Sequence, residues 1–190
     1  MLILASQSPR RKELLEKLKI PFIIRVSGAD ESMDPFVPPE DEVARLSYGK
    51  AMAIDRQPED IVIAADTIVV LDGRVLGKPA DEADALDMLQ RLSGRSHQVM
   101  TGVTVLRGER AITHTEITHV HFRHLTQEEM QRYVATGEPM DKAGSYGIQG
   151  GAALFVEAIS GDYYNVMGLP VCRLWQMLLT IAPEITEDIQ

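Results

Sequence analysis

The chain has 190 residues, of which 45% are hydrophobic and 25% charged, a composition typical of a globular protein large enough to bury a core. Its 19 lysines and arginines stand against 28 aspartates and glutamates, and the formal charge of −9 argues against nucleic acid or an anionic membrane as a partner. The single cysteine excludes an internal disulfide framework, and no apolar run suits a membrane span or a signal peptide, so we expect a cytoplasmic protein.

The first sixty residues are predicted to alternate between strand and helix. An apolar run at 3–5 is followed by Ser8 and Pro9, which are typical of the N-cap and the first position of a helix. The elements expected next are a strand at 21–26, a loop at 27–41 and a helix at about 43–54.

The middle of the chain is predicted to hold a central strand and a long hairpin. Residues 61–71, IVIAADTIVVL, are the most apolar stretch, and Asp72–Gly73 is a two-residue hairpin signal. Asp81 is placed to cap the following helix. The last elements of this part are extended segments at about 97–107 and 110–123.

The remaining residues predict two helices, a glycine-rich loop and a short strand. Thr126 with Glu129 forms a capping box. The other expected elements are a loop at 136–151, a strand at 154–156, a helix at about 169–181 and a frayed acidic tail at about 183–190. This order favours one domain over residues 1–190 with a mixed α/β sheet.

Arg10 and Arg11 stand at the start of the first predicted helix, where the partial positive charge of a helix N-terminus favours carboxylates. A bound anion would reverse this unfavourable placement, because guanidinium groups form paired hydrogen bonds with phosphate oxygens. The alternative is a solvated first turn in which Glu13 and Glu16 offset the charge. The local pattern leaves both interpretations open.

Asp66 interrupts the apolar strand at 61–71. An ionised carboxylate in a protein interior is costly unless it is paired or binds a metal, so a role at a strand end facing a cleft is favoured over a purely structural one. Lys78 follows the hairpin and can lie near Asp66, and Lys50 is carried by a predicted helix. Each lysine alone is typical of a solvated surface charge.

The segment DKAGSYGIQGG at 141–151 allows a close approach of backbone to a ligand, and Gln149 offers both a donor and an acceptor for a nucleotide base. A plain turn is the alternative, and the P-loop pattern is absent. His119 and His121 share a strand face, but zinc needs three or four ligands, so we expect them on a solvent-facing strand.

Six segments resemble, in order, the Maf family of nucleoside triphosphate pyrophosphatases: LILASQSPRR, AADTIVVLDG, LGKP, LSGRSHQVMTGV, DKAGSYGIQG and YYNVMGLP. The resemblance covers nearly the whole chain except the acidic tail. It implies an elongated Maf/ITPase-like fold with a mixed β-sheet flanked by helices and two lobes around a central cleft. It also implies metal-dependent hydrolysis of a nucleoside triphosphate to the monophosphate and pyrophosphate.

The resemblance assigns roles to individual residues. Asp66 matches the catalytic base, and Glu31 matches an acidic position near the metal and the water. Glu31 and Asp66 are the expected ligands of a Mg²⁺ or Mn²⁺ ion, and the sequence leaves open whether Asp66 deprotonates the attacking water directly or holds the metal that acidifies it. The positions that hold the phosphates are matched by Ser8, Arg11, Lys50 and Lys78.

Three further positions bear on substrate choice. Arg10, Thr67 and Gln149 resemble the branch of the family that hydrolyses dTTP and UTP, whereas Trp, Gln and Glu are typical of the branch that acts on 7-methyl-GTP. The implied role is house-cleaning of the nucleotide pool, and the resemblance leaves open whether the cellular substrate is a canonical or a modified pyrimidine nucleotide. The family's tendency to dimerise makes a homodimer one of the expected states. The alternatives are a non-catalytic nucleotide-binding regulator of cell division and a zinc hydrolase that uses His119 and His121.

Overall fold

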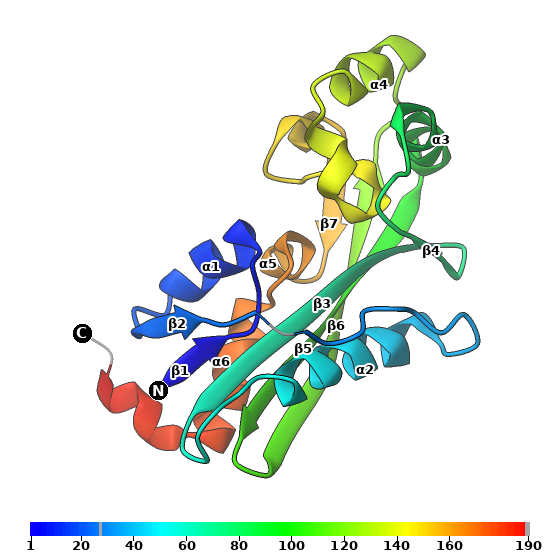
Figure 1. Cartoon of the computed structure of the whole chain (residues 1–190). Coiled ribbons are helices and arrows are strands. Elements are labelled where there is room, and N and C mark those ends of the chain that lie inside the picture. The colour runs from blue at the N-terminus through cyan, green and yellow to red at the C-terminus, as the bar shows by residue number, and fades with distance from the viewer. Residues whose placement is uncertain (27, 189–190) are drawn as a thin grey trace. The chain divides into compact units, whose positions relative to one another are not determined.

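The computed structural model describes residues 1–26 and 28–188 of the chain (Figure 1). Seven strands form one mixed sheet in the order β2-β1-β3-β5-β6-β7, with β4 paired to β3. The strands are β1 (Leu2–Leu4), β2 (Phe22–Ile24), β3 (Ile61–Leu71), β4 (Arg74–Leu76), β5 (Ser96–Arg107), β6 (Arg110–Phe122) and β7 (Val156–Ser160). The predicted mixed α/β class is therefore confirmed.

Helices connect and flank these strands. The α-helices are α1 (Pro9–Glu16), α2 (Pro39–Met52), α3 (Glu82–Leu92), α4 (Gln127–Val134), α5 (Tyr163–Met167) and α6 (Val171–Ile181). The short 3₁₀ helices are η1 (Glu138–Asp141), η2 (Ala143–Ser145), η3 (Gly151–Leu154) and η4 (Pro183–Asp188). Within the described residues, no helix has the length and apolar character that crossing a membrane requires.

β1 lies between β2 and β3 and pairs with both in parallel (Figure 1). Leu2 is the register partner of Phe22 on one side and of Ile61 on the other. Parallel neighbours need a crossover connection, and α1 supplies the one between β1 and β2. The sharp turn that leads from β1 into α1 therefore lies at the carboxyl end of β1, next to the carboxyl end of a parallel neighbour.

Several local signals in the sequence take the expected form. Ser8 caps α1 and Asp81 caps α3, each by accepting a hydrogen bond from the backbone N–H three residues later. Thr126 forms the predicted capping box at the start of α4. Asp72 and Gly73 both have positive φ, of 52° and 73°, as the two-residue turn between β3 and β4 requires.

Several elements differ from the sequence prediction. α2 begins at Pro39 rather than at about residue 43, and the loop predicted at 136–151 contains η1, η2 and the start of η3. The strand expected at 154–156 begins only at Val156, because residues 151–154 form η3. α5 was not predicted, since five residues carry too short a periodic pattern. The tail is helical at 183–188 rather than frayed, with the Ile185 side chain only 4% exposed, while residues 189–190 lie outside the described part.

The chain divides into two compact units. The first comprises residues 1–66, 101–116 and 168–190, and the second comprises residues 67–100 and 117–167. The first unit has an aliphatic core cluster made of Ile3, Ala5, Ala51, Ile54, Val62, Ala64 and Leu106. The second unit is built around edge-to-face aromatic contacts among His97, Phe122, Tyr133, Tyr146 and Phe155.

Candidate active site

The turn between β1 and α1 is tied together by serine hydroxyls. Ser8 Oγ accepts a hydrogen bond from the backbone N–H of Arg11 at 3.4 Å, and Ser6 Oγ accepts one from the N–H of Ser8 at 3.2 Å. No acidic residue lies in the first turn of α1. The helix therefore presents a positive N-terminal end with no carboxylate of its own to neutralise it.

The side chain of Arg11 folds back against this turn. Its Nε donates to the carbonyl oxygen of Gly168 at 2.8 Å, and a terminal nitrogen lies 3.4 Å from Ser6 Oγ. Burial lowers the pKa of the Arg11 guanidinium, whereas the negative charges of Asp66 and Glu31 raise it. Arg11 is thus a fixed cation within the electric field of the two predicted metal ligands.

Lys50 brings those two carboxylates together. Its Nζ lies 2.6 Å from Asp66 Oδ1 and 3.3 Å from Glu31 Oε1. Lys50 is 7% exposed, and an ammonium group so deeply buried must be paired with carboxylate oxygens. The sequence alone suggested a solvated surface lysine at this position, and that interpretation is wrong.

Asp66 occupies a distinctive place in β3. Asp66 and Thr67 are the only two residues of this strand that are not fully buried. Asp66 comes from the strand, Lys50 from the last turn of α2, and Glu31 from the loop before α2. Asp66 is therefore a partly exposed carboxylate in a largely apolar, buried strand, as the interrupted pattern suggested.

The loop that carries Glu31 is anchored by Glu42, which is 1% exposed and which the sequence reasoning did not single out. Glu42 Oε1 accepts a hydrogen bond from the backbone N–H of Asp34 at 2.7 Å, and both Glu42 oxygens pair with the Arg45 guanidinium at 2.6 and 2.9 Å. Arg45 also donates to the carbonyl oxygen of Ser32 at 2.8 Å. The signal in the sequence was a carboxylate three residues before an arginine on one helix face.

The second unit holds three of the predicted site residues: Thr67 in β3, and Lys78 and Gln149 on two loops. Lys78 is exposed just after β4, and Gln149 is exposed in the glycine-rich segment. The two loops touch, because the N–H of Gly144 donates to the carbonyl oxygen of Gly77 at 3.0 Å. Gly144 has a φ of +67°, and a Cβ there would meet the Val69 side chain at 2.8 Å, so this contact requires glycine.

The group formed by Glu31 and Asp66 suits a divalent metal ion. The two carboxylates converge on one cation, the ammonium of Lys50, and Mg²⁺ is usually held by one or two carboxylates with substrate phosphates and water. Over residues 1–26 and 28–188, no group of three or more His, Cys, Asp or Glu side chains is placed to hold an ion without such help. The donor set therefore fits a metal shared with a bound phosphate.

The paired histidines have other contacts. His121 lies 3.0 Å from Ser96 Oγ and 3.4 Å from Glu157, and His119 lies 3.2 Å from the Gln98 amide nitrogen. The described residues bring no third ligand to this pair. The zinc hydrolase interpretation therefore finds no support in the geometry.

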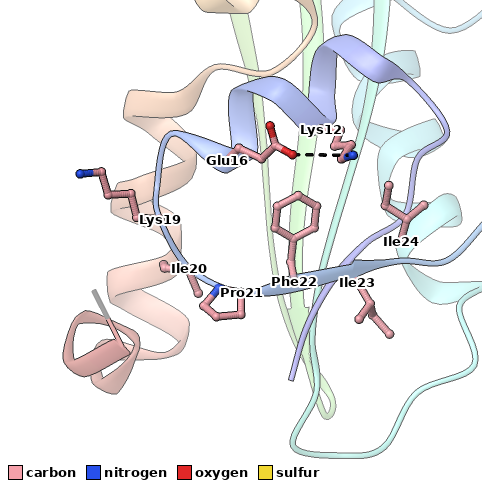
Figure 2. Close-up of a pocket in the computed structure, with 8 residues that line it drawn as sticks. All are labelled: Lys12, Glu16, Lys19, Ile20, Pro21, Phe22, Ile23 and Ile24. Atoms are coloured by element: carbon pink, nitrogen blue, oxygen red, sulfur yellow. Dashed lines mark ion pairs between the residues drawn. The ribbon is translucent and has the colours of Figure 1, made fainter. Parts of the chain in front are cut away.

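An open pocket of about 560 Å³ lies between α1 and the edge strand β2 (Figure 2). Phe22 projects from β2 towards α1, beneath the ion pair of Lys12 and Glu16, whose charged atoms are 3.7 Å apart. None of the residues predicted to bind phosphate, metal or base lines this pocket. The pocket is therefore separate from the candidate active site.

Comparisons with known proteins agree over most of the chain. Residues 1–181 match the family described as Maf-like protein. A dTTP/UTP pyrophosphatase of Symbiobacterium thermophilum is 57% identical over 93% of this chain and 92% of the relative. Another dTTP/UTP pyrophosphatase, from Bacillus cytotoxicus, is 53% identical over 90% of this chain and 91% of the relative. A solved structure described as a HAM1 protein from Coxiella burnetii covers 95% of this chain and 98% of its own, with 16% identity and a TM-score of 0.49.

Proposed function

We propose that this chain, which belongs to the Maf family, hydrolyses dTTP and UTP to the nucleoside monophosphate and pyrophosphate. The names of its relatives support this substrate class. The observation that carries the proposal is the convergence of Glu31 and Asp66 on Lys50, within the electrostatic reach of Arg11. A nucleoside triphosphate with its metal ion needs both kinds of group, because carboxylates bind the metal and cations bind the phosphates.

In this proposal the phosphates are held by the residues around the start of α1. The N-terminal N–H groups of the helix, Ser8 and Arg11 bind phosphate oxygens, and Lys50 and Lys78 add positive charge. Glu31 and Asp66 would hold a Mg²⁺ or Mn²⁺ ion, which when bound withdraws negative charge from the phosphates and acidifies water. Arg11 is already fixed by Gly168 and Ser6, so substrate binding costs it little side-chain entropy.

Asp66 is the proposed general base. It accepts a proton from the attacking water as the water oxygen forms a bond to phosphorus. The bond between that phosphorus and the bridging oxygen breaks, and the electron pair leaves with pyrophosphate. Arg11 is the cation proposed to stabilise the charge that develops on this leaving group.

The base is proposed to be read by Arg10, Thr67 and Gln149. Changing these three residues together to Trp, Gln and Glu should move the preference from pyrimidine towards purine nucleotides. If the triple variant keeps the parent's preference between pyrimidine and purine nucleotides, these positions do not determine base specificity.

We further propose that residues 1–190 act as one domain, in the cytoplasm, as a homodimer.

The test is release of pyrophosphate from a panel of NTPs and dNTPs with Mg²⁺ or Mn²⁺. We expect turnover of dTTP and UTP that falls by roughly a thousandfold in Asp66→Asn, because general-base catalysis contributes about 10²–10⁴-fold. Asp87→Asn, at an exposed position of α3, is the matched control and should retain the parent rate.

Each other outcome has a distinct meaning. Turnover of purine nucleotides alone would keep the reaction and overturn the substrate class. Nucleotide binding without turnover by the parent protein would favour the regulator of cell division. The presence of Asp66, Glu31 and Lys78 argues against that alternative, since a protein that only binds nucleotide does not need a general base.

A further inference from the structure

The segment 147–151 forms a tight turn that presents Gln149. The N–H of Gly150 donates to the carbonyl oxygen of Gly147 at 3.0 Å, which closes the turn. Ile148 is 7% exposed and points into the second unit, whereas Gln149 is exposed. A turn with three glycines has little intrinsic stiffness, so other groups must determine where the Gln149 amide lies.

One pair of side chains holds both ends of this turn. The N–H of Gly147 donates to the Tyr133 hydroxyl at 3.1 Å, and the N–H of Gly151 donates to Glu138 Oε2 at 3.0 Å. The Tyr133 hydroxyl in turn donates to Glu138 Oε1 at 2.9 Å. Tyr133 and Glu138 thus form a clamp, by which we mean this hydrogen-bonded pair and its two backbone contacts.

The Tyr133 phenol of the clamp stays un-ionised. Tyr133 is 5% exposed, and burial raises the pKa of its phenol above the usual range. The hydrogen bond from the Gly147 N–H opposes this shift, and the hydrogen bond to Glu138 and the charges of Glu138 and Asp141 add to it. The phenol therefore remains neutral and keeps the hydrogen that it donates to Glu138. Lys142 Nζ donates to the carbonyl oxygen of Glu138 at 2.6 Å, so the Lys142 side chain is held at the start of η1.

The glycines of the turn match the clamp. A Cβ at Gly150 would lie 2.0 Å from Glu138 Oε1, and one at Gly147 would lie 2.7 Å from Lys142 Cε. The backbone of the turn is therefore packed directly on the carboxylate. Glycine at these positions serves close approach to Glu138, and that purpose differs from close approach to a ligand.

We propose that Tyr133 and Glu138 are positioning residues for base selection, acting through Gln149. The inference rests on the proposed function, because it assumes that Gln149 reads the base. A donor and an acceptor on one amide discriminate between bases only when both are held in place, and small misplacements carry large penalties. The clamp fixes the two ends of the turn and leaves its exposed residue free to contact a nucleotide.

The test compares Tyr133→Phe and Glu138→Gln with the parent in the ratio of kcat/KM for dTTP to kcat/KM for dGTP. We expect this ratio to fall by roughly tenfold in each variant, with a smaller change in kcat for dTTP. Hydrogen exchange of the 147–151 amides should become faster. Matched controls are Tyr163→Phe and Glu128→Gln, both at exposed positions, which should leave the ratio unchanged.

A double-mutant cycle separates positioning from general damage. In a Gln149→Ala background, Tyr133→Phe should have no further effect on the ratio. An equal loss for dTTP and dGTP, or an unchanged ratio in a folded Tyr133→Phe variant, would overturn the inference. If the parent itself does not prefer dTTP, the proposed substrate class fails instead, and unchanged exchange of the amides would then overturn the clamp separately.

Discussion

Two loops, one in each unit, present a polar side chain that the proposed reaction uses, and each is held by a glutamate that accepts a backbone N–H. Glu42 holds the loop of Glu31 through Asp34, and Glu138 holds the turn of Gln149 through Gly151. The partner of the first glutamate is a charged arginine, and that of the second is a neutral tyrosine.

The difference in partner matches the task of each loop. The first loop delivers a carboxylate into a region of strong charge, and hydrogen bonds from Arg45, followed by the Asp34 amide, lower the pKa of Glu42. The second loop delivers an amide that must distinguish hydrogen-bond patterns, and its glutamate is held by the Tyr133 hydroxyl. A charge-balanced anchor therefore serves metal and phosphate binding, and a neutral phenol serves base reading.

Replacing Lys50, the cation that pairs with Glu31 of the first loop, should have the largest effect. Lys50→Met removes the ion-pair partner that Glu31 and Asp66 share and leaves only the charge of Arg11 near them, so we expect a roughly thousandfold fall in kcat/KM and a loss of about 3 kcal/mol in the free energy of unfolding. Added Mg²⁺ should raise the melting temperature of this variant more than that of the parent. Lys17→Met, on the surface after α1, is the control, and equal Mg²⁺ shifts in Lys50→Met and the parent would contradict the convergence of carboxylates.

The stability of the second unit should depend on pH through His97. This residue is 2% exposed, and its Nε2 lies 2.7 Å from the Tyr146 hydroxyl. Burial, followed by the charge of His121, lowers the pKa of His97 to about 4. The unfolded chain, with the ordinary pKa of about 6.5, binds the extra proton first, so stability is complete above pH 6.5 and declines as the pH falls towards 4.

The predicted loss from this source is about 3 kcal/mol between pH 7 and pH 4. Urea unfolding of the parent and of His97→Gln across this range measures it. The difference in unfolding free energy between the two proteins should shrink by that amount, since the variant lacks the titrating ring. Parallel pH profiles for parent and variant would show that His97 does not titrate in this way.

Substitutions of the two anchoring glutamates, Glu42 and Glu138, should have different effects on the protein. Glu42→Gln places an amide N–H against existing donors, so it should cost about 2 kcal/mol of unfolding free energy and raise the half-saturating Mg²⁺ concentration several-fold. The ratio of dTTP to dGTP turnover should stay constant, whereas Glu138→Gln should change that ratio and leave the Mg²⁺ requirement alone. Identical behaviour of the two variants would remove the distinction between the loops.

The same change has a pH signature. The pKa of Glu42 is lowered in the folded state, so its stabilising contribution is present above the unfolded pKa near 4.5 and is lost as the pH falls through the folded value. The unfolding free energies of the parent and Glu42→Gln should therefore converge in acid. Chemical denaturation at neutral pH and at low pH provides this measurement.

The smallest effect is expected at a helix cap outside both loops. Thr126→Ala removes the hydroxyl of the capping box at α4 and should lower the free energy of unfolding by about 1 kcal/mol. Neither the Mg²⁺ requirement nor the base ratio should change, and thermal unfolding with the two activity measurements tests this. A changed ratio of dTTP to dGTP turnover would mean that the stability of α4, which carries Tyr133, itself affects base selectivity.

The local features of the chain could be predicted from the sequence because they depend on neighbouring residues. Ser8, Asp81 and Thr126 each accept from a backbone N–H three positions away, and Asp72–Gly73 turns the chain by its own dihedral preferences. Hydrophobic periodicity likewise placed the long strands and most helices. The family motifs added the candidate site residues, which local pattern alone left open.

The pairing of charges was decided only by the tertiary structure. Lys50 has the sequence pattern of a surface lysine and is buried against Asp66, sixteen positions away, and Glu31 reaches the same ammonium from a loop. The clamp of Tyr133 and Glu138 likewise depends on how η1 and the glycine-rich turn fold onto one another. The sequence by itself determined the type and order of most helices, turns and strands, because those forces act over a few residues. Which buried group partners which depends on burial and distance, and these exist only once the chain has folded.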